Sequence, residues 1–161
     1  LEKTPQHIKK IKFILRLFPK SKVIHIYRDG RDCYISGKNA KNIPQSLNLK
    51  TYAKYWKKCI KNRLEVKSKK IFDTSYETLV SDPKTILTEI FKFLNVEFSD
   101  NQMNMRNYSH DKRAQTEAFK RLNDKIDSSS VNQHLKYMSK EEIQEFNDIC
   151  SDQLIKLGYN L

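Results

Sequence analysis

The sequence predicts an α/β fold in which parallel strands are joined by helices. Two short runs rich in β-branched and aromatic residues, at positions 22–27 and 70–76, are typical of buried strands. Segments with apolar residues at helical spacing lie before, between and after them, and the scarcity of glycine and proline favours helices over tight turns. Strands that alternate with helices in this order lie parallel, with the helices as crossover connections.

The N-terminal elements follow from capping residues and apolar spacing. Thr4 and Pro5 indicate a helix start, as N-cap and first helical residue, and the apolar spacing continues to position 18. The strand at 22–27 ends at an Arg-Asp-Gly turn, and we expect a helix over 31–39 after it.

The middle of the chain repeats this alternation. A loop at 42–48 precedes a long helix over 49–66, with Trp56 as a core residue on its apolar side. After the second strand, Asp82 and Pro83 cap and open another helix.

The last third begins with polar residues and ends in a helix. Positions 99–130 are polar and basic without a clean period, and we interpret them as a mobile loop with one short helix. Ser139 and Glu142 fit a capping box that starts the final helix, and Gly158 is suited to end it. Because two strands do not make a stable sheet, we expect residues 1–161 to form one partial domain that takes further strands from elsewhere.

The positive net charge favours negatively charged partners. The net charge of +12 and the pI of about 9.6 attract polyanions, nucleotides, acidic lipids or sulfated substrates. A lysine run over positions 57–70 supports a basic nucleic-acid-binding module as an alternative, but no known nucleic-acid-binding motif is evident and nucleic acid is not the expected partner. Solvated helix faces are the ordinary explanation of most of these lysines.

Cysteine spacing and hydropathy argue against a metal-binding protein and against a membrane-spanning segment. The three cysteines are far apart and the four histidines scattered, so we expect reduced thiols and no metal site. No apolar window is long enough to span a bilayer, and no signal peptide is evident. The expected compartment is the cytoplasm, although a targeting or anchoring segment could precede Leu1.

Arg28 follows the first strand, where open parallel sheets bind their ligands. Its guanidinium can bind a phosphate through two parallel hydrogen bonds, and the hydroxyl of Ser36, about two helical turns further on, could donate to the same phosphate. From position alone the simpler interpretation is an Arg28 paired with Asp29 or Asp32, and a Ser36 that faces solvent.

The wider motif resembles the 3′-phosphate motif of sulfotransferases. The chain reads KVIHIYRDGRDCYIS over positions 22–36, and the family has a strand, then Arg-Asp-Pro-Arg-Asp, then a serine eight residues after the first arginine. Gly30 stands in place of the commoner proline. The resemblance implies a helix-rich, P-loop-NTPase-like parallel sheet flanked by helices. It also implies that Arg28 and Ser36 hold the 3′-phosphate of the sulfate donor PAPS (3′-phosphoadenosine 5′-phosphosulfate).

Other segments resemble the family in the same order, over most of the chain except about 99–125. The Lys-Thr-Pro turn at the N-terminus implies that Lys3 lies beside the oxygen bridging to the leaving phosphate, with His7 a candidate base. His110 and His134 are weaker alternatives for the base.

Two later segments extend the implied nucleotide site. A Tyr-Glu-Thr-Leu segment implies that Tyr76 packs against adenine or, as the alternative, within the core. The loop SVNQH resembles the family's Ser-Val-Gly-Arg-Trp, so Ser130 and Val131 would close over the nucleotide. The replacement of Gly, Arg and Trp at positions 132–134 puts a direct phosphate contact from this loop in doubt.

The family's first strand and glycine-rich 5′-phosphosulfate loop have no counterpart among the three glycines. We therefore expect that an N-terminal fragment of the same protein supplies them, and that this chain alone is inactive without it. The implied function is transfer of a sulfuryl group from PAPS, without a metal, to a hydroxyl or amine acceptor, with a carbohydrate or small alcohol favoured. A non-catalytic sulfotransferase-like scaffold is the further alternative.

Overall fold

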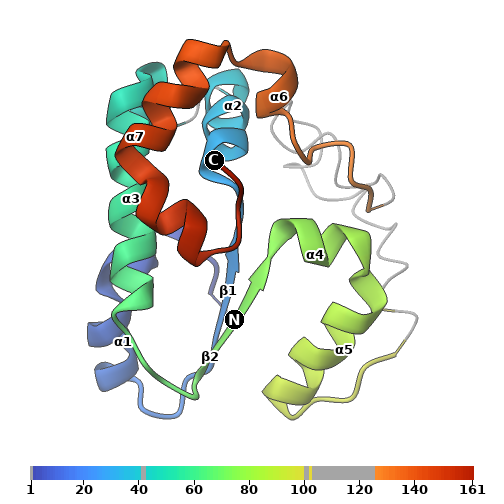
Figure 1. Ribbon diagram of the computed structural model, residues 1–161. Coiled ribbons are helices and arrows are strands. Elements are labelled where there is room, and N and C mark those ends of the chain that lie inside the picture. Colours follow the sequence, from blue (N-terminus) through green and yellow to red (C-terminus); the bar gives the residue numbers. More distant parts are fainter. Residues whose placement is uncertain (1, 41–42, 100–101, 103–125) are drawn as a thin grey trace. The chain divides into compact units, whose positions relative to one another are not determined.

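The computed structural model describes residues 2–40, 43–99, 102 and 126–161 (Figure 1). These residues form helices and strands in this chain order: η1 (Pro5–Lys10), α1 (Ile11–Leu17), β1 (Val23–Tyr27), α2 (Gly30–Ala40), η2 (Pro44–Leu47), α3 (Leu49–Leu64), β2 (Ile71–Ser75), α4 (Tyr76–Ser81), α5 (Pro83–Leu94), α6 (His134–Tyr137) and α7 (Lys140–Lys156). η1 and η2 are 3-10 helices. The helix-rich α/β class predicted from the sequence is confirmed.

The chain divides into two compact units. Unit 1 consists of Leu1–Val23, Arg28–Ile71 and Asn132–Leu161, and unit 2 of Ile24–Tyr27 and the described part of Phe72–Val131. The expectation of one domain over 1–161 stays a prediction.

The sheet among the described residues has two strands, β1 and β2, which pair in parallel. The Val23 N–H donates to the carbonyl of Lys70 at 2.8 Å, and further along both strands the Nδ1 atom of His25 lies 2.8 Å from a carboxylate oxygen of Asp73. Both contacts advance in the same direction along the two strands, as parallel register requires. Each strand starts one residue later than the sequence predicts, and β2 also ends one residue earlier.

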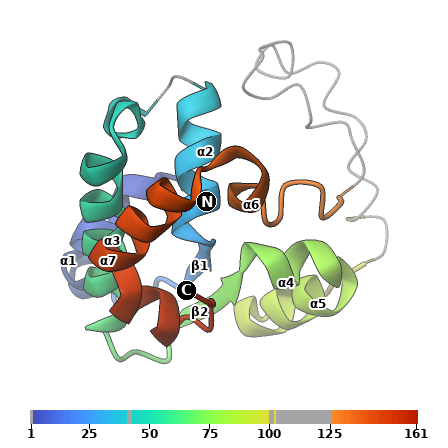
Figure 2. The same cartoon turned by 45° about the horizontal axis from the view of Figure 1, so that its top comes forward.

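Helix α3 is the centre of unit 1, and it runs beside α7 in both ribbon views (Figures 1 and 2). The rings of Trp56 on α3 and Phe146 on α7 lie 6.0 Å apart, and both side chains are buried. Trp56 is therefore the core anchor that the sequence predicts. The thiol of Cys150 donates to the carbonyl of Ala53 at 3.3 Å, and burial raises the pKa of Cys150 to about 12. This cysteine is thus an inert core residue.

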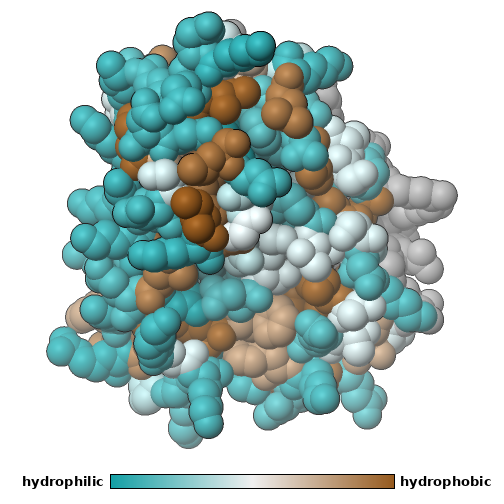
Figure 3. All heavy atoms as spheres, in the orientation of Figure 1, coloured by the Kyte–Doolittle hydropathy of each residue, from teal (hydrophilic) through white to brown (hydrophobic). Residues whose placement is uncertain are grey.

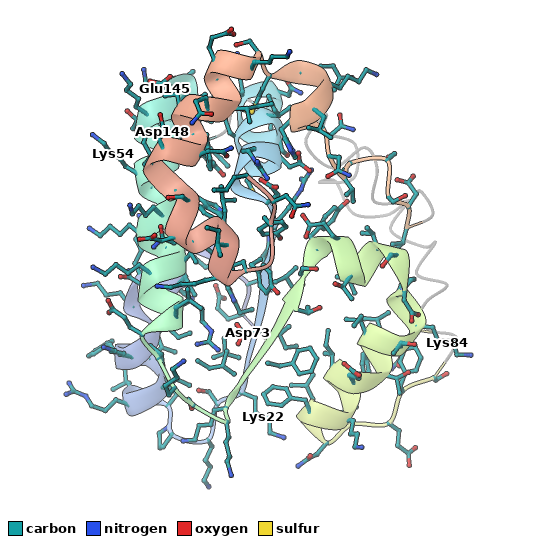
Figure 4. All side chains as sticks on the ribbon, viewed as in Figure 1. Lys22, Lys54, Asp73, Lys84, Glu145 and Asp148 are labelled. Carbon is teal, nitrogen blue, oxygen red and sulfur yellow. The ribbon has the colours of Figure 1, made fainter. Side chains whose placement is uncertain are left out.

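Figure 4 shows where charged residues lie on the outer faces of α3 and α7: Lys54 on the former, Glu145 and Asp148 on the latter. The ammonium of Lys50 lies 2.9 Å from the carboxylate of Glu145. Both partners are substantially exposed, so this pair adds little to stability.

A second core cluster lies where the N-terminal helices meet the base of the strands. It contains buried Ile11, Val66 and Ile71, with Ile8, Leu15 and Val23 packed against them. The helix start at Pro5 is confirmed, but the capping bond expected from Thr4 is not made. The Thr4 hydroxyl donates to the carboxylate of Glu2 instead, and the first turns form a 3-10 helix.

Unit 2 packs α5 against the sheet through aromatic and aliphatic side chains. The rings of Phe72 on β2 and Phe93 on α5 lie 5.6 Å apart, and Ile86 and Ile90 are buried. The carboxylate of Asp82 accepts a hydrogen bond from the Thr85 N–H at 3.2 Å, which confirms the predicted helix start.

The C-terminal end follows the predicted signals. Ser139 and Glu142 form both hydrogen bonds of the capping box. Gly158 has a φ of 83°, the left-handed conformation expected after a helix C-terminus. The predicted character of positions 99–130 concerns mostly residues outside those that the structure describes.

Hydrophilic residues dominate the face drawn in Figure 3, with apolar residues in small groups between them. Within the described ranges, none of the helices combines the length and the apolar character that a membrane span needs.

Candidate functional site

Arg28 occupies the position between the end of β1 and the first turn of α2, in unit 1. Its side chain is 17% exposed, and Nη2 lies 3.8 Å from Oδ2 of Asp32. The indole N–H of Trp56 donates to the Arg28 carbonyl at 3.3 Å, which fixes the backbone here. The alternative pairing of Arg28 with Asp32 is therefore present, but at a distance longer than a hydrogen bond.

Ser36 lies on α2, one turn beyond Asp32, and it is exposed. Residues four apart share one face of a helix, so Asp32 and Ser36 lie in line along α2 from the turn that carries Arg28. The spacing predicted from the sequence thus places the Ser36 hydroxyl on the helix face that starts at Arg28.

Asp32 is buried and bound by His134, which lies at the start of α6. Oδ1 of Asp32 accepts a hydrogen bond from the His134 backbone N–H at 2.9 Å and lies 2.7 Å from Nδ1 of the His134 ring. Burial alone would raise the pKa of Asp32, but these hydrogen bonds and the charges of His134 and Arg28 outweigh it and lower the pKa. Because Asp32 is then ionised, Nδ1 of His134 must carry the proton and donate.

The other acidic residue of the motif, Asp29, is bound by Arg31. The guanidinium donates to both carboxylate oxygens, from Nε at 3.0 Å and from Nη2 at 2.7 Å. It also donates to the side chain of Asn147 at 3.2 Å and to the carbonyl of Asn160 at 2.8 Å. Arg31 therefore joins the strand end to α7 and to the C-terminal segment.

These pairings decide the electrostatics beside Arg28. Each carboxylate of the motif has a partner other than Arg28: Arg31 for Asp29, and His134 for Asp32. The N-terminus of α2, an 11-residue helix, adds a partial positive charge at the same place. A half-buried guanidinium beside a helix N-terminus suits a phosphate-sized anion.

The two residues predicted to act in transfer lie at the N-terminal end of unit 1. Lys3 and His7 are exposed, and the His7 N–H donates to the carbonyl of Thr4 at 3.0 Å. The segment is held to α3 by Lys9, whose ammonium lies 4.6 Å from the ring centre of Tyr55. Among the contacts of the described residues, none joins Lys3 or His7 to Arg28 or Ser36.

The remaining predicted residues belong to unit 2. Tyr76 is half-buried and is the first residue of α4, directly after the carboxyl end of β2. Ser130 and Val131 are half-buried in a turn, where the Val131 N–H donates to the carbonyl of Ser128 at 2.9 Å. His110 lies outside the described residues.

The sequence reasoning missed a cross-strand pair in unit 2. Nδ1 of His25 on β1 lies 2.8 Å from a carboxylate oxygen of Asp73 on β2, and the ring of Tyr27 lies 5.9 Å from that of His25. Asp73 is labelled in Figure 4. Burial and the charges of Asp73 and Glu77 raise the pKa of Tyr27. The apolar pattern of the strand gave no reason to expect a polar contact there, although a histidine inside a strand was a visible signal.

It also missed the Arg31 clamp and the role of His134, which was weighed only as a base. In the structure His134 is 4% exposed, and its Nδ1 atom lies 2.7 Å from the carboxylate of Asp32. Asn132, in the SVNQH loop, has a φ of 59°. This is a left-handed conformation, which glycine adopts most easily and asparagine more easily than most other residues. Asn132 can therefore replace the glycine of the resembling loop.

No cluster of three or more His, Cys, Asp or Glu side chains suited to a metal ion occurs within residues 2–40, 43–99, 102 and 126–161.

Comparisons with known proteins bear on the family and on the fold. A family model described as "Sulfotransferase family" matches residues 1–100. No curated protein matches this chain. Among solved structures, a sulfotransferase domain from the curacin biosynthetic pathway matches with a TM-score of 0.63 and 19% identity over 99% of this chain. This chain spans 62% of the length of that domain.

The structural match shows the fold: a helix-rich α/β arrangement of the P-loop-like kind found in that sulfotransferase domain. The family model covers the segment that contains Lys3, Arg28, Ser36 and Tyr76, which is well over half of the sequence. This chain belongs to the sulfotransferase family.

Proposed function

We propose that this protein contributes to a PAPS-dependent sulfotransferase, and that the turn from β1 into α2 binds the 3′-phosphate of the donor. The observation that carries the proposal is the position of Arg28, at the carboxyl end of β1 with both neighbouring carboxylates engaged by other residues. Ligands of open parallel sheets bind at this end of the strands.

Several groups of unit 1 would contact the 3′-phosphate. The Arg28 guanidinium would donate two parallel hydrogen bonds to the phosphate, and the exposed Ser36 hydroxyl would donate a third. The N-terminus of α2 would add its partial positive charge. In unit 2, Tyr76, Ser130 and Val131 would contact the nucleoside.

In the proposed reaction the acceptor oxygen or nitrogen forms a bond to sulfur as the bond from sulfur to the bridging phosphate oxygen breaks. The ammonium of Lys3 would stabilise the negative charge that develops on this oxygen. The imidazole of His7 would take the proton that the acceptor loses. Both side chains are exposed in the same short N-terminal segment, and this supports the assignment.

The acceptor and the rest of the donor site are also proposals. We favour a carbohydrate or small alcohol as acceptor, and a segment of the same protein as the source of the 5′-phosphosulfate loop. The length of the matched sulfotransferase domain, of which this chain spans 62%, supports the second point.

Calorimetric titration of the complete protein with adenosine 3′,5′-bisphosphate and with AMP tests the donor site. The bisphosphate should bind more tightly, and Arg28→Ala should weaken it by about 30- to 100-fold while AMP changes little, since only the 3′-phosphate loses its partner. Arg16→Ala, which removes an exposed arginine from α1, is the matched control and should change neither affinity. Equal affinities for the two nucleotides in the unmutated protein would refute the proposed site.

Sulfate transfer measured with a panel of acceptors tests the catalytic assignments. Lys3→Ala should lower kcat by about a hundredfold without changing the affinity for the bisphosphate, because its charge is needed only as the bridging bond breaks. Lys10→Ala, another exposed lysine of the same segment, should leave kcat unchanged. A protein that binds the bisphosphate but transfers no sulfate would instead be a non-catalytic scaffold.

A further inference from the structure

Helix α1 has apolar side chains on two opposite faces. Its inner face contributes Ile11 and Leu15, which are four residues apart, to the second core cluster. On the outer face Phe13 is 52% exposed and Leu17 is 57% exposed, and Phe18 at the end of the helix is 58% exposed. The inner face is therefore already used by the core, while three large apolar side chains remain largely in water. Exposed apolar groups of this kind mark surfaces that bind a partner.

The segment that carries these side chains is strongly basic. Positions 5–27 contain six lysines and arginines and no aspartate or glutamate. Lys12 is exposed, and the Arg16 guanidinium lies 5.9 Å from the centre of the Phe13 ring. Both ribbon views show α1 beside the end of α3 (Figures 1 and 2), where the carboxylate of Glu65 lies 4.0 Å from the Lys12 ammonium. That pair is well exposed and therefore weak, so cations dominate the surroundings of the apolar side chains.

Exposed apolar side chains among cations on one helix indicate an anionic lipid surface as the partner. Helices that lie in the plane of a membrane combine Phe and Leu, which enter the boundary of the acyl chains, with Lys and Arg, which face the headgroups. Each cation near an anionic bilayer contributes favourable free energy, and the burial of apolar area contributes more. Attachment to a membrane is stable when two such contributions act together.

Other occupants of this face fit the observations less well. A second copy of the chain would bring together two net charges of +12. Nucleic acid would pair its phosphates with the lysines but would leave the side chain of Leu17 in water. An acidic protein surface is disfavoured because protein interfaces are enriched in arginine and depleted in lysine, whereas the segment 5–27 contains five lysines and one arginine.

We propose that the outer face of α1 attaches this protein to membranes that contain anionic lipids. Phe13, Leu17 and Phe18 would enter the interface, and the neighbouring lysines would contact lipid phosphates. The helix would lie along the surface, because its 7 residues are too few to cross a bilayer. This inference goes beyond the proposed function and does not depend on binding of the donor, so either can fail without the other.

Co-sedimentation of the complete protein with lipid vesicles tests the proposal. Vesicles of phosphatidylcholine with about 30% phosphatidylserine should bind the protein at least about tenfold more tightly than vesicles of phosphatidylcholine alone. Leu17→Ser should weaken binding to the anionic vesicles by about tenfold, because its apolar side chain no longer enters the interface. Leu47→Ser removes a leucine that is 80% exposed on η2, and it should leave binding unchanged.

A pair of double variants separates the cations of this segment from the overall charge. Lys12→Gln with Lys20→Gln removes two exposed lysines and should weaken binding to the anionic vesicles by about tenfold. Lys140→Gln with Lys156→Gln removes two exposed lysines from α7 and should weaken it by less than about twofold. Equal losses in the two double variants would overturn the proposal, because the net charge rather than α1 would then attract the lipid.

A fluorescent probe on the outer face of α1 reports its insertion directly. The emission of Phe13→Trp should move to shorter wavelength when anionic vesicles are added, and brominated lipids should quench it, whereas Trp56 is buried in the core. An emission that vesicles leave unchanged would overturn the proposal. If that emission is at short wavelength from the start, another part of the protein or a second copy covers the face, and light scattering distinguishes these two. Binding to heparin but not to vesicles, unaffected by Leu17→Ser, would overturn it in favour of a polyanion.

Discussion

Among single residues, Arg31 is notable because its guanidinium donates hydrogen bonds to three different partners. It is 4% exposed and donates to Asp29, Asn147 and the carbonyl of Asn160. The motif thus contains two arginines with different tasks. Arg31 joins the strand end to α7 and to the C-terminal segment, and Arg28 lies at the end of the strand, where we propose that the 3′-phosphate binds.

Arg31→Ala should lower the free energy of unfolding by about 3–5 kcal/mol, because it removes the guanidinium that donates to both oxygens of the buried Asp29 carboxylate. Arg31→Lys should also destabilise, since a lysine keeps the charge but cannot form the paired hydrogen bonds. Urea unfolding measures both changes, with Arg16→Ala as the exposed control. A loss below about 1 kcal/mol in Arg31→Ala would show that Asp29 finds other partners.

Asp32 gives the protein a pH-dependent part of its stability. Its pKa is lowered on folding, so its contribution is fully present well above the unfolded pKa of about 3.9 and is lost as the pH falls through that value and then through the folded pKa. The difference in unfolding free energy between the unmutated protein and Asp32→Asn should therefore be largest at pH 6–7 and shrink below about pH 4. A difference that stays constant from pH 7 to about pH 3 would contradict the lowered pKa.

For single residues, the sequence predicted that Arg28 pairs with a carboxylate of the motif, but it did not predict the other residues around that pair. The motif offered Asp29 or Asp32 as partners of Arg28, and the structure selects Asp32. Neither His134 nor Asn147 could be assigned, because they lie 102 and 116 residues from their partners. Local patterns contain no information on such long-range contacts.

At the scale of elements, the first turn of α2 approaches two aromatic rings very closely. A Cβ atom added to Gly30 would lie 2.6 Å from a ring atom of Trp56 and 2.7 Å from one of Phe146. These rings occupy the space that the family's commoner proline would need. Gly30 and the large rings of α3 and α7 are therefore a matched set.

Gly30→Ala should destabilise the protein by about 1–3 kcal/mol, since the added methyl group overpacks the core. In Phe146→Leu, which makes room, the same change should cost less, and a double-mutant cycle of unfolding free energies measures that coupling. Gly158→Ala is a useful comparison, because it meets no atoms within 4 Å and its cost comes from its φ of 83° alone. Strict additivity of Gly30→Ala and Phe146→Leu would refute the steric explanation.

The elements with strong local signals were predicted well. The capping box at Ser139, the cap at Asp82 and the apolar face of α3 all appear as expected. The short helices α4 and α6 were not predicted, because helices of 6 and 4 residues are too short to show a period. Thr4 lies at the predicted N-cap, but its hydroxyl oxygen accepts no capping hydrogen bond, and the hydroxyl donates to Glu2.

For the whole molecule, the dominant physical fact is the net charge of +12. Repulsion among like charges opposes the compact state, and salt screens it. Raising NaCl from about 10 to about 150 mM shortens the screening length from about 30 to about 8 Å, and should raise the melting temperature by about 2–4 °C. The same increase in Arg28→Ala would show that screening, rather than chloride bound at the proposed nucleotide site, is the cause. A fall in melting temperature would mean that ion pairs such as Lys50–Glu145 outweigh the repulsion.

The hydrogen bond from Arg31 to the Asn160 carbonyl has a consequence for the order of events in folding. It joins residues 129 apart in the chain, and the bond from His134 to Asp32 joins residues 102 apart. Closing loops of this length costs entropy that only extensive collapse can offset, so both contacts form late. During synthesis, Arg28 leaves the ribosome long before the residues that complete its surroundings. A partly made chain thus has the motif but not the surroundings of Arg28, and the proposed ability to bind the donor should appear only in the last steps of folding.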